Sequence, residues 1–185
     1  LHRTCYTKWA GPLHERAEYW TANGFAFMLQ DVRGRGDSEG VFYPLVNERL
    51  DGLDTLDWLT EQPWSDGRVV MMGGSYSGWA QTYLAADNHP ALVAIAPTTT
   101  PPDPDRSFPI DRGMIAPAAA AWLATLDGHT NQDIGRCDVQ GAFAKLPIID
   151  FDRHIGRDLA IWRDWIENAP GTDYWSAQSY QKNLG

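Results

Sequence analysis

The chain has 185 residues, of which 43% are hydrophobic and 21% charged, so it has enough apolar material for one domain with a sizeable core. Its formal net charge of −9 opposes contact with nucleic-acid phosphates or anionic lipid, and no apolar run approaches membrane-spanning length, so we expect neither nucleic acid nor membrane as a partner. The two cysteines, Cys5 and Cys137, are too few for a disulfide framework or a cysteine-rich metal site, and we expect free thiols, no metal and no cofactor.

The hydrophobic pattern predicts alternating helices and strands through the first hundred residues. Helices are predicted where apolar residues recur every three or four positions, and strands where short continuous apolar runs suit burial on both faces. In chain order the predicted elements are a helix over 13–23, a strand over 25–29, a polar loop over 30–40, a helix over 47–62, a strand over 69–72, a helix over 79–86 and a strand over 92–96. This order predicts an α/β fold, in which helices flank a parallel sheet and functional groups gather at the carboxyl ends of the strands.

The pattern changes after Pro97. A loop rich in threonine, proline and aspartate is followed by segments dominated by alanine and tryptophan, with helices predicted over 116–126 and 159–168 and no further strand. We therefore divide the chain into a partial sheet-containing core over 1–100 and an all-helical insertion over 101–185.

A glycine-flanked serine stands between the strand at 69–72 and the following helix. A sharp strand-to-helix turn strains its central residue, and only small neighbours let the two arms pass, which gives Gly73, Gly74 and Gly78 a steric role. The hydroxyl of Ser75 would then be exposed at a helix N-terminus, where unpaired N–H groups favour developing negative charge. These features suit a nucleophile for acyl transfer. The alternative is a glycine-rich turn in which the serine caps the helix.

Five separated segments form a more specific pattern than this turn alone. They are Arg3-Thr4-Cys5-Tyr6-Thr7-Lys8, then Asp31-Val32-Arg33-Gly34-Arg35-Gly36-Asp37-Ser38-Glu39-Gly40, then Asp51-Gly52-Leu53-Asp54-Thr55 with Trp58-Leu59 and Gln62-Pro63-Trp64, then Gly73 to Gly78, and Asp173-Tyr174-Trp175. With these segments the chain resembles the bacterial family of cocaine esterases, α-amino acid ester hydrolases and X-prolyl dipeptidyl peptidases. That family also shows glycine at the place of Gly78, where the common Gly-x-Ser-x-Gly pattern has it one residue earlier. The resemblance implies a partial α/β-hydrolase fold with a helical cap.

The resemblance also implies three roles in acyl transfer. Ser75 would attack the acyl carbonyl, while the backbone N–H of Tyr76 and the hydroxyl of Tyr6 would donate to the oxyanion. For Tyr6 the alternative is simple aromatic packing at a strand end. The family usually has proline where this chain has Cys5, so we expect a less rigid turn before Tyr6.

The charged loop over 31–40 has a simpler interpretation than catalysis. We expect Asp31, Arg33 and Asp37 to pin the loop beside Ser75 by ion pairs and backbone hydrogen bonds. Asp51 and Asp54, near the start of a helix, are interpreted as charges that complement the helix dipole or brace the loop.

A serine nucleophile needs a histidine base and a carboxylate that orients it. The histidines are His2, His14, His89, His129 and His154. In the resembled family the acid and the base follow the helical insertion, so we expect this chain to be an inactive internal fragment that holds the nucleophile and the oxyanion donors without the base. His154 is the alternative base, but a position on the surface of an insertion helix explains it more simply.

By analogy with the family, the helical insertion roofs an acyl pocket. Phe108 and Trp122 are the predicted substrate contacts, with core packing as their alternative, and Asp103, Asp105 and Asp111 are candidates to bind a substrate ammonium. The expected partner is a small-molecule ester or amide. An X-prolyl dipeptidyl aminopeptidase and a non-catalytic binding domain of α/β-hydrolase fold remain alternatives, and the oligomeric state stays open.

Overall fold

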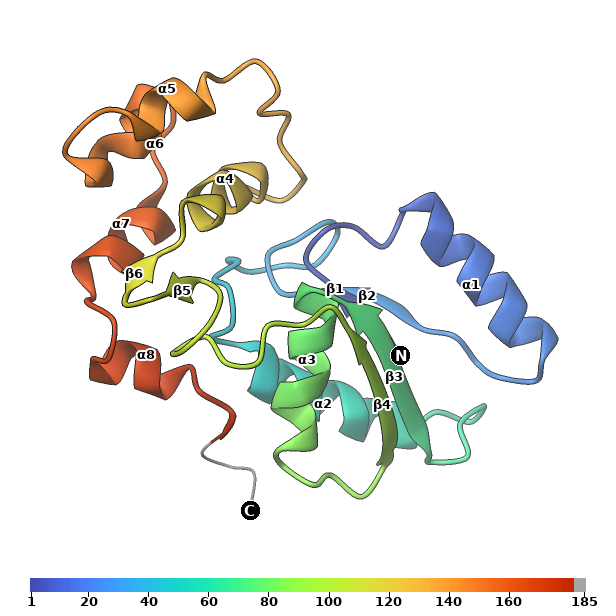
Figure 1. Ribbon diagram of the computed structural model, residues 1–185. Helices are drawn as coiled ribbons and strands as arrows, with labels where there is room; N and C mark the ends of the chain where they lie inside the picture. The colour runs from blue at the N-terminus through green and yellow to red at the C-terminus, as the bar shows by residue number, and fades with distance from the viewer. Residues whose placement is uncertain (182–185) are drawn as a thin grey trace. The chain divides into compact units, whose positions relative to one another are not determined.

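The computed structural model describes residues 1–181, which divide into two compact units (Figure 1). The first comprises residues 1–100 with residues 180–181, and the second comprises Pro101–Ser179. The elements of the first unit are β1 (His2–Thr4), α1 (Gly11–Ala22), β2 (Leu29–Asp31), α2 (Glu48–Thr60), β3 (Val69–Gly74), α3 (Tyr76–Ala85) and β4 (Leu92–Thr98). Among residues 1–181, no helix combines the length and apolar character needed to cross a bilayer.

The strands of the first unit pair in parallel, with helices α1, α2 and α3 between them along the chain (Figure 1). In one ladder Arg3 of β1 lies opposite Gln30 of β2, and in the other β3 runs beside β4. The two ladders meet where the Met72 N–H donates to the Leu1 carbonyl, at 3.3 Å. This parallel arrangement confirms the predicted α/β fold.

The core of the first unit lies between the sheet and helices α2 and α3. Leu56 of α2 and Leu84 of α3 are completely buried there, and burial of such a side chain contributes about 1.5–3 kcal/mol. The two helices approach closely because Gly52 has no side chain. A Cβ at that position would lie 2.5 Å from Leu84 Cδ2 and 2.8 Å from Arg3 Nη1.

Two predicted elements of the first unit are displaced. The apolar run over 25–29 was predicted to be a buried strand, but β2 begins only at Leu29 and Phe25 is 48% exposed. The ladder with β1 ends at the bond from His2 N–H to the Met28 carbonyl, and no described strand pairs with the residues before it. Helix α3 begins at Tyr76, three residues earlier than predicted, because the whole turn is made at Ser75.

The second unit is mainly helical. Its elements are β5 (Ile110–Asp111), β6 (Met114–Ile115), α4 (Pro117–Thr125), α5 (Val139–Phe143), η1 (Ile148–Asp150), α6 (Phe151–His154), α7 (Ala160–Glu167) and α8 (Asp173–Ala177). The prediction of no strand after Pro97 was wrong, because β5 and β6 form a short antiparallel ladder. Positive φ angles at Arg112 and Gly113, 50° and 81°, allow the tight turn between them.

Tryptophans form the centre of the second unit's core. Trp162, Trp165 and Trp175 are each no more than 1% exposed. The indole N–H groups of two of them also have backbone acceptors, since Trp162 donates to Ile149 at 3.1 Å and Trp175 to Asn168 at 2.8 Å. These three side chains therefore serve packing, and the indole N–H groups of Trp162 and Trp175 are satisfied inside the unit.

Candidate active site

Ser75 lies at the junction of β3 and α3 in a strained backbone conformation. Its φ is 56° and its ψ −123°, a region that side-chain-bearing residues rarely adopt. The conformation is fixed from both sides, because the Ser75 N–H donates to the Thr98 carbonyl at 2.9 Å and its carbonyl accepts from Gly78 N–H at 2.9 Å. The side chain itself is exposed. The turn therefore presents the hydroxyl outward at the start of a helix.

Two glycines make this turn sterically possible. A Cβ at Gly78 would lie 1.6 Å from Thr100 Oγ1, closer than any non-bonded contact allows. Gly73 has a φ of 147°, and a Cβ there would lie 2.6 Å from Ser77 Cβ and 3.0 Å from His2 Cε1. Strand β3 and helix α3 thus leave no room for a side chain at Gly73 or Gly78, as the sequence interpretation required.

The Tyr6 phenol faces the serine hydroxyl. Tyr6 follows β1, and its Oη lies 3.0 Å from Ser75 Oγ in a solvent-accessible hydrogen bond. Because a phenol can donate one proton, it is suited to stabilise negative charge that develops on an oxygen next to Ser75 Oγ.

Tyr76 supplies a backbone N–H in the first turn of α3, directly after the serine. Its ring is completely buried, and its hydroxyl donates to Glu48 Oε1 at 2.8 Å and accepts from Leu45 N–H at 3.1 Å. Burial, with the nearby Glu48 charge, raises the pKa of Tyr76 well above its ordinary value, so the phenol stays protonated. Glu48 is itself paired with buried Arg3, at 3.0 Å. This buried network anchors Tyr76, whose N–H is the predicted second oxyanion donor.

The loop over 31–40 is held by charges, in agreement with the sequence interpretation. Arg33 forms a two-point ion pair with Asp51, with Nε at 2.9 Å from Oδ2. Lys8 Nζ lies 2.9 Å from Asp37 Oδ2, and the Lys8 N–H donates to Asp31 Oδ1 at 2.7 Å.

Within residues 1–100, the Ser75 hydroxyl makes no hydrogen bond with a histidine. His2 Nε2 instead lies 3.2 Å from Oγ of Ser77, beneath the turn, and both side chains are buried. Burial, with the charge of Arg16, lowers the pKa of His2 to about 4, so the ring is neutral at physiological pH. His154, the alternative base, is an exposed residue at the end of α6 in the second unit. The pairing of His2 with Ser77 was not predicted from the sequence.

The predicted substrate contacts Phe108 and Trp122 lie together in the second unit. Their ring centroids are 5.7 Å apart in an edge-to-face arrangement, and Trp122 also stacks on Trp165. Both are only partly buried against the helical core. Asp103, a candidate for binding a substrate ammonium, is instead buried and accepts from Ser179 Oγ at 2.7 Å, so its carboxylate serves the unit's own structure.

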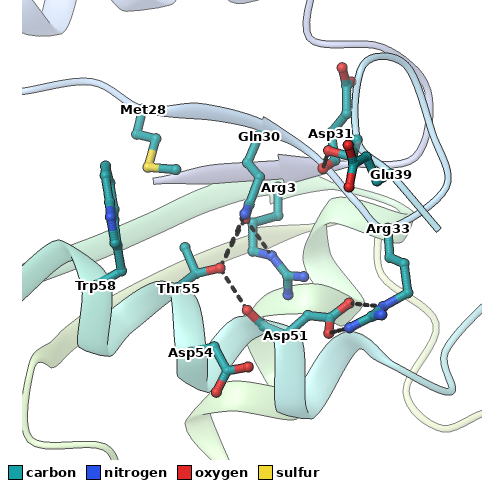
Figure 2. A pocket seen from close by; sticks show the side chains of 11 residues that line it. Arg3, Met28, Gln30, Asp31, Arg33, Glu39, Asp51, Asp54, Thr55 and Trp58 are labelled. Atoms are coloured by element: carbon teal, nitrogen blue, oxygen red, sulfur yellow. Dashed lines mark hydrogen bonds and ion pairs between the residues drawn. The ribbon is translucent and has the colours of Figure 1, made fainter.

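A pocket of about 510 Å³ opens elsewhere on the first unit (Figure 2). Its lining comes from β1, β2, α2 and the charged loop, and includes neither Ser75 nor Tyr6. Figure 2 shows Gln30 bridging Arg3 and Thr55, and Arg33 paired with Asp51. The polar groups drawn at its centre thus bind one another. We assign this pocket no part in acyl transfer.

The sequence of this chain matches a known protein family over its whole length. Residues 1–185 match the family described as X-Pro dipeptidyl-peptidase (S15 family). A protein of Mycobacterium bovis that is named as a serine esterase is 36% identical over 160 residues, covering 79% of this chain and 24% of the relative. Cocaine esterase of Rhodococcus sp. is 44% identical over 81 residues, covering 44% of this chain and 14% of the relative.

A solved structure shares the fold over nearly the whole chain. An α-amino acid ester hydrolase, 23% identical, superposes with a TM-score of 0.73 over 98% of this chain and 34% of its own. The chain therefore spans no more than about a third of the length of these proteins. The match across all 185 residues confirms the predicted resemblance: the chain belongs to the X-Pro dipeptidyl-peptidase (S15) family.

Proposed function

We propose that the protein containing this chain hydrolyses carboxylic esters or amides through an acyl-enzyme intermediate on Ser75. The observation that carries the proposal is the strained, exposed Ser75 with the Tyr6 phenol 3.0 Å from its Oγ. Ser75 Oγ attacks the acyl carbon and passes its proton to a base. The Tyr6 hydroxyl and the Tyr76 N–H stabilise the resulting oxyanion until the alcohol or amine leaves, and water then attacks the acyl-enzyme.

We further propose that the histidine base and its carboxylate partner come from outside residues 1–181. The support is that Ser75 has a phenol partner but no histidine partner within residues 1–100, although acylation requires a proton acceptor. His2 cannot fill this role as placed, since its ring is buried and lies against Ser77. The 185-residue chain alone is therefore expected to show no sustained ester turnover.

We propose esters as the preferred substrates. A dipeptidyl peptidase must bind the free ammonium of its substrate, and one of the three carboxylates predicted for that task, Asp103, is buried and bonded to Ser179. Two relatives that are more than 30% identical over their matched residues are named as esterases. We propose that Phe108 and Trp122 form an aromatic wall for the acyl group, because both rings remain partly accessible.

Covalent labelling of the full-length protein tests this function. A fluorophosphonate should modify Ser75, and Ser75→Ala should abolish both labelling and aryl-ester hydrolysis. Ser77→Ala is the matched control, because this neighbouring serine is buried against His2 and should leave labelling in place. Faster turnover of a prolyl amide than of an aryl ester would favour the peptidase. Absence of Ser75 labelling would support the non-catalytic alternative and refute the proposal.

Substitution in the second unit tests the acyl wall. Phe108→Ala should raise KM for a benzoyl ester while leaving an acetyl ester nearly unchanged, because only the larger acyl group would reach an aromatic wall. Equal effects on both esters would assign Phe108 to packing.

A further inference from the structure

Two buried charged side chains hold the backbone on either side of Tyr6. The Arg35 Nε donates to the carbonyl of Cys5, the residue before Tyr6, at 2.7 Å. Asp31 Oδ1 accepts from the N–H of Lys8, two residues after Tyr6, at 2.7 Å. Arg35 is 1% exposed and Asp31 2% exposed, so both bonds are made by side chains buried in the protein. The phenol that faces Ser75 thus lies on a short segment clamped at both ends.

Strand pairing alone does not fix this segment. The parallel ladder of β1 ends at Thr4, whose carbonyl accepts from Val32 N–H at 2.9 Å. Tyr6 lies beyond that point, outside any helix or strand, and its own N–H donates to the nearby Thr4 hydroxyl, at 3.1 Å. The direction in which the phenol leaves the backbone therefore depends on contacts made by other residues of the loop.

The clamp has strong geometric constraints. A hydrogen bond from a charged donor or to a charged acceptor is shorter and stronger than a neutral one, and a buried charge without a partner is costly. Arg35 also packs with its guanidinium carbon 5.4 Å from the Phe42 ring centroid, which restricts where its Nε can point. These constraints favour one position for the Cys5 carbonyl and hence for the start of the Tyr6 segment.

The glycines of the charged loop serve the same arrangement. Gly36 has a φ of 54°, and a Cβ there would lie 2.1 Å from Asp31 Oδ2. Gly34 has a φ of 72°, and a Cβ there would lie 2.1 Å from the backbone nitrogen of Phe42. The loop can fold back tightly enough to bring both Arg35 and Asp31 to the Tyr6 segment because these positions lack side chains.

We propose that Arg35 and Asp31 are positioning residues for the oxyanion donor Tyr6. The proposal rests on the proposed function of Ser75 and Tyr6. Neither residue has to touch the substrate. Their effect is to hold the phenol beside Ser75 before the substrate binds, so that no reorganisation is needed when negative charge develops.

A double-mutant cycle in the full-length protein separates positioning from general stability. Arg35→Gln should lower kcat for an aryl ester by roughly tenfold to a hundredfold with little change in KM, because a misplaced donor weakens transition-state stabilisation alone. In the Tyr6→Phe background the same substitution should cost less than about threefold, because the group it positions is already absent. Equal losses in both backgrounds would overturn the proposal. If Arg35→Gln fails to fold, two milder variants carry the same test. Arg35→Lys keeps the positive charge, and Asp31→Asn keeps an acceptor oxygen.

A second readout does not require activity. In protein labelled with 3-fluorotyrosine, the ¹⁹F resonance of Tyr6 can be assigned by its loss in Tyr6→Phe. Arg35→Gln should shift or broaden that resonance, whereas Arg33→Gln should leave it unchanged, because Arg33 lies in the same loop but pairs with Asp51. An unchanged Tyr6 resonance in folded Arg35→Gln would refute the positioning role. If Ser75 fails to react with fluorophosphonate while the resonance still responds, the proposed function fails, and Arg35 holds the Tyr6 side chain without a part in acyl transfer.

Discussion

Replacing Tyr6 by phenylalanine removes one oxygen atom at the candidate oxyanion site and leaves the ring in place. That oxygen lies 3.0 Å from Ser75 Oγ in the resting protein. Loss of an oxyanion donor typically costs ~10²–10³ in rate, or about 2.7–4 kcal/mol of transition-state stabilisation. The resting hydrogen bond to Ser75, worth about 0.5 kcal/mol where water competes for it, must be given up when the phenol turns to the oxyanion. We therefore expect a loss near the lower end, about a hundredfold.

The assay compares acylation rates with folding stability. Fluorophosphonate inactivation and aryl-ester turnover of full-length Tyr6→Phe should both slow, with the loss in kcat and little change in KM. Because the Tyr6–Ser75 bond is accessible to water, the free energy of unfolding should change by less than about 0.5 kcal/mol. Tyr19→Phe is the matched control, since this phenol is 63% exposed on α1.

One outcome would refute the role of Tyr6 as an oxyanion donor. If Tyr6→Phe acylates within about threefold of the unmodified protein while Ser75→Ala is inactive, the phenol is not an oxyanion donor, because a donor in that position contributes far more. The short distance to Ser75 would then reflect only a resting contact.

Two further predictions concern the turn itself. Gly78→Ala should destabilise the protein by about 1–3 kcal/mol, although alanine favours a helix, because its Cβ overlaps the Thr100 side chain. Adding Thr100→Gly should restore the melting temperature. An unaltered melting temperature in Gly78→Ala alone would contradict the overlap. The second prediction concerns the pH dependence of stability. The pKa of His2 is lowered to about 4 from an ordinary value of 6.5, so the unfolded chain binds the proton more readily than the folded protein. Stability is then fully present above pH 6.5 and falls as the pH drops towards 4, by at most about 3 kcal/mol. His2→Gln, which can still bond Ser77, should flatten this part of a denaturation profile, and a slope equal to that of the unmodified protein would assign the pH dependence to other groups.

The sequence predicted the parts of the site that depend on local chemistry. The turn at Ser75 was predictable because its glycines, the apolar run before it and the helix-forming residues after it are all contiguous. Helix α2 was predictable from its periodicity, although only part of the expected stripe is buried: Leu56 is inaccessible while Leu50 is 61% exposed. Periodicity identifies a helix but does not specify how much of its apolar face is buried against other elements.

Long-range contacts were not predictable from patterns. Ser77 and His2 are 75 residues apart, and nothing local to either marks them as partners. Arg35 binds the carbonyl of Cys5, and a backbone acceptor leaves no trace in residue identity. The prediction of a strand over 25–29 was wrong for a related reason. An apolar run such as that at Phe25 has the same sequence pattern whether or not another strand pairs with it.

The strained backbone at Ser75 predicts a trade between stability and activity. A side-chain-bearing residue in such a conformation costs about 1–3 kcal/mol, whereas glycine adopts positive φ freely. Ser75→Gly should therefore stabilise the protein by roughly 0.5–2 kcal/mol, after subtracting the larger entropy that glycine loses on folding. Ser75→Ala removes the same hydroxyl but keeps a Cβ, so it should leave stability nearly unchanged.

Chemical denaturation of both full-length variants isolates the strain, because neither retains the nucleophile or its bond to Tyr6. A higher midpoint for Ser75→Gly than for Ser75→Ala, with equal slopes, would measure the strain that the fold sustains at this serine. Equal midpoints would show that the turn is relaxed. The exposure of the hydroxyl would then follow from the position of the turn alone, and the inference of a nucleophile from backbone strain would fail.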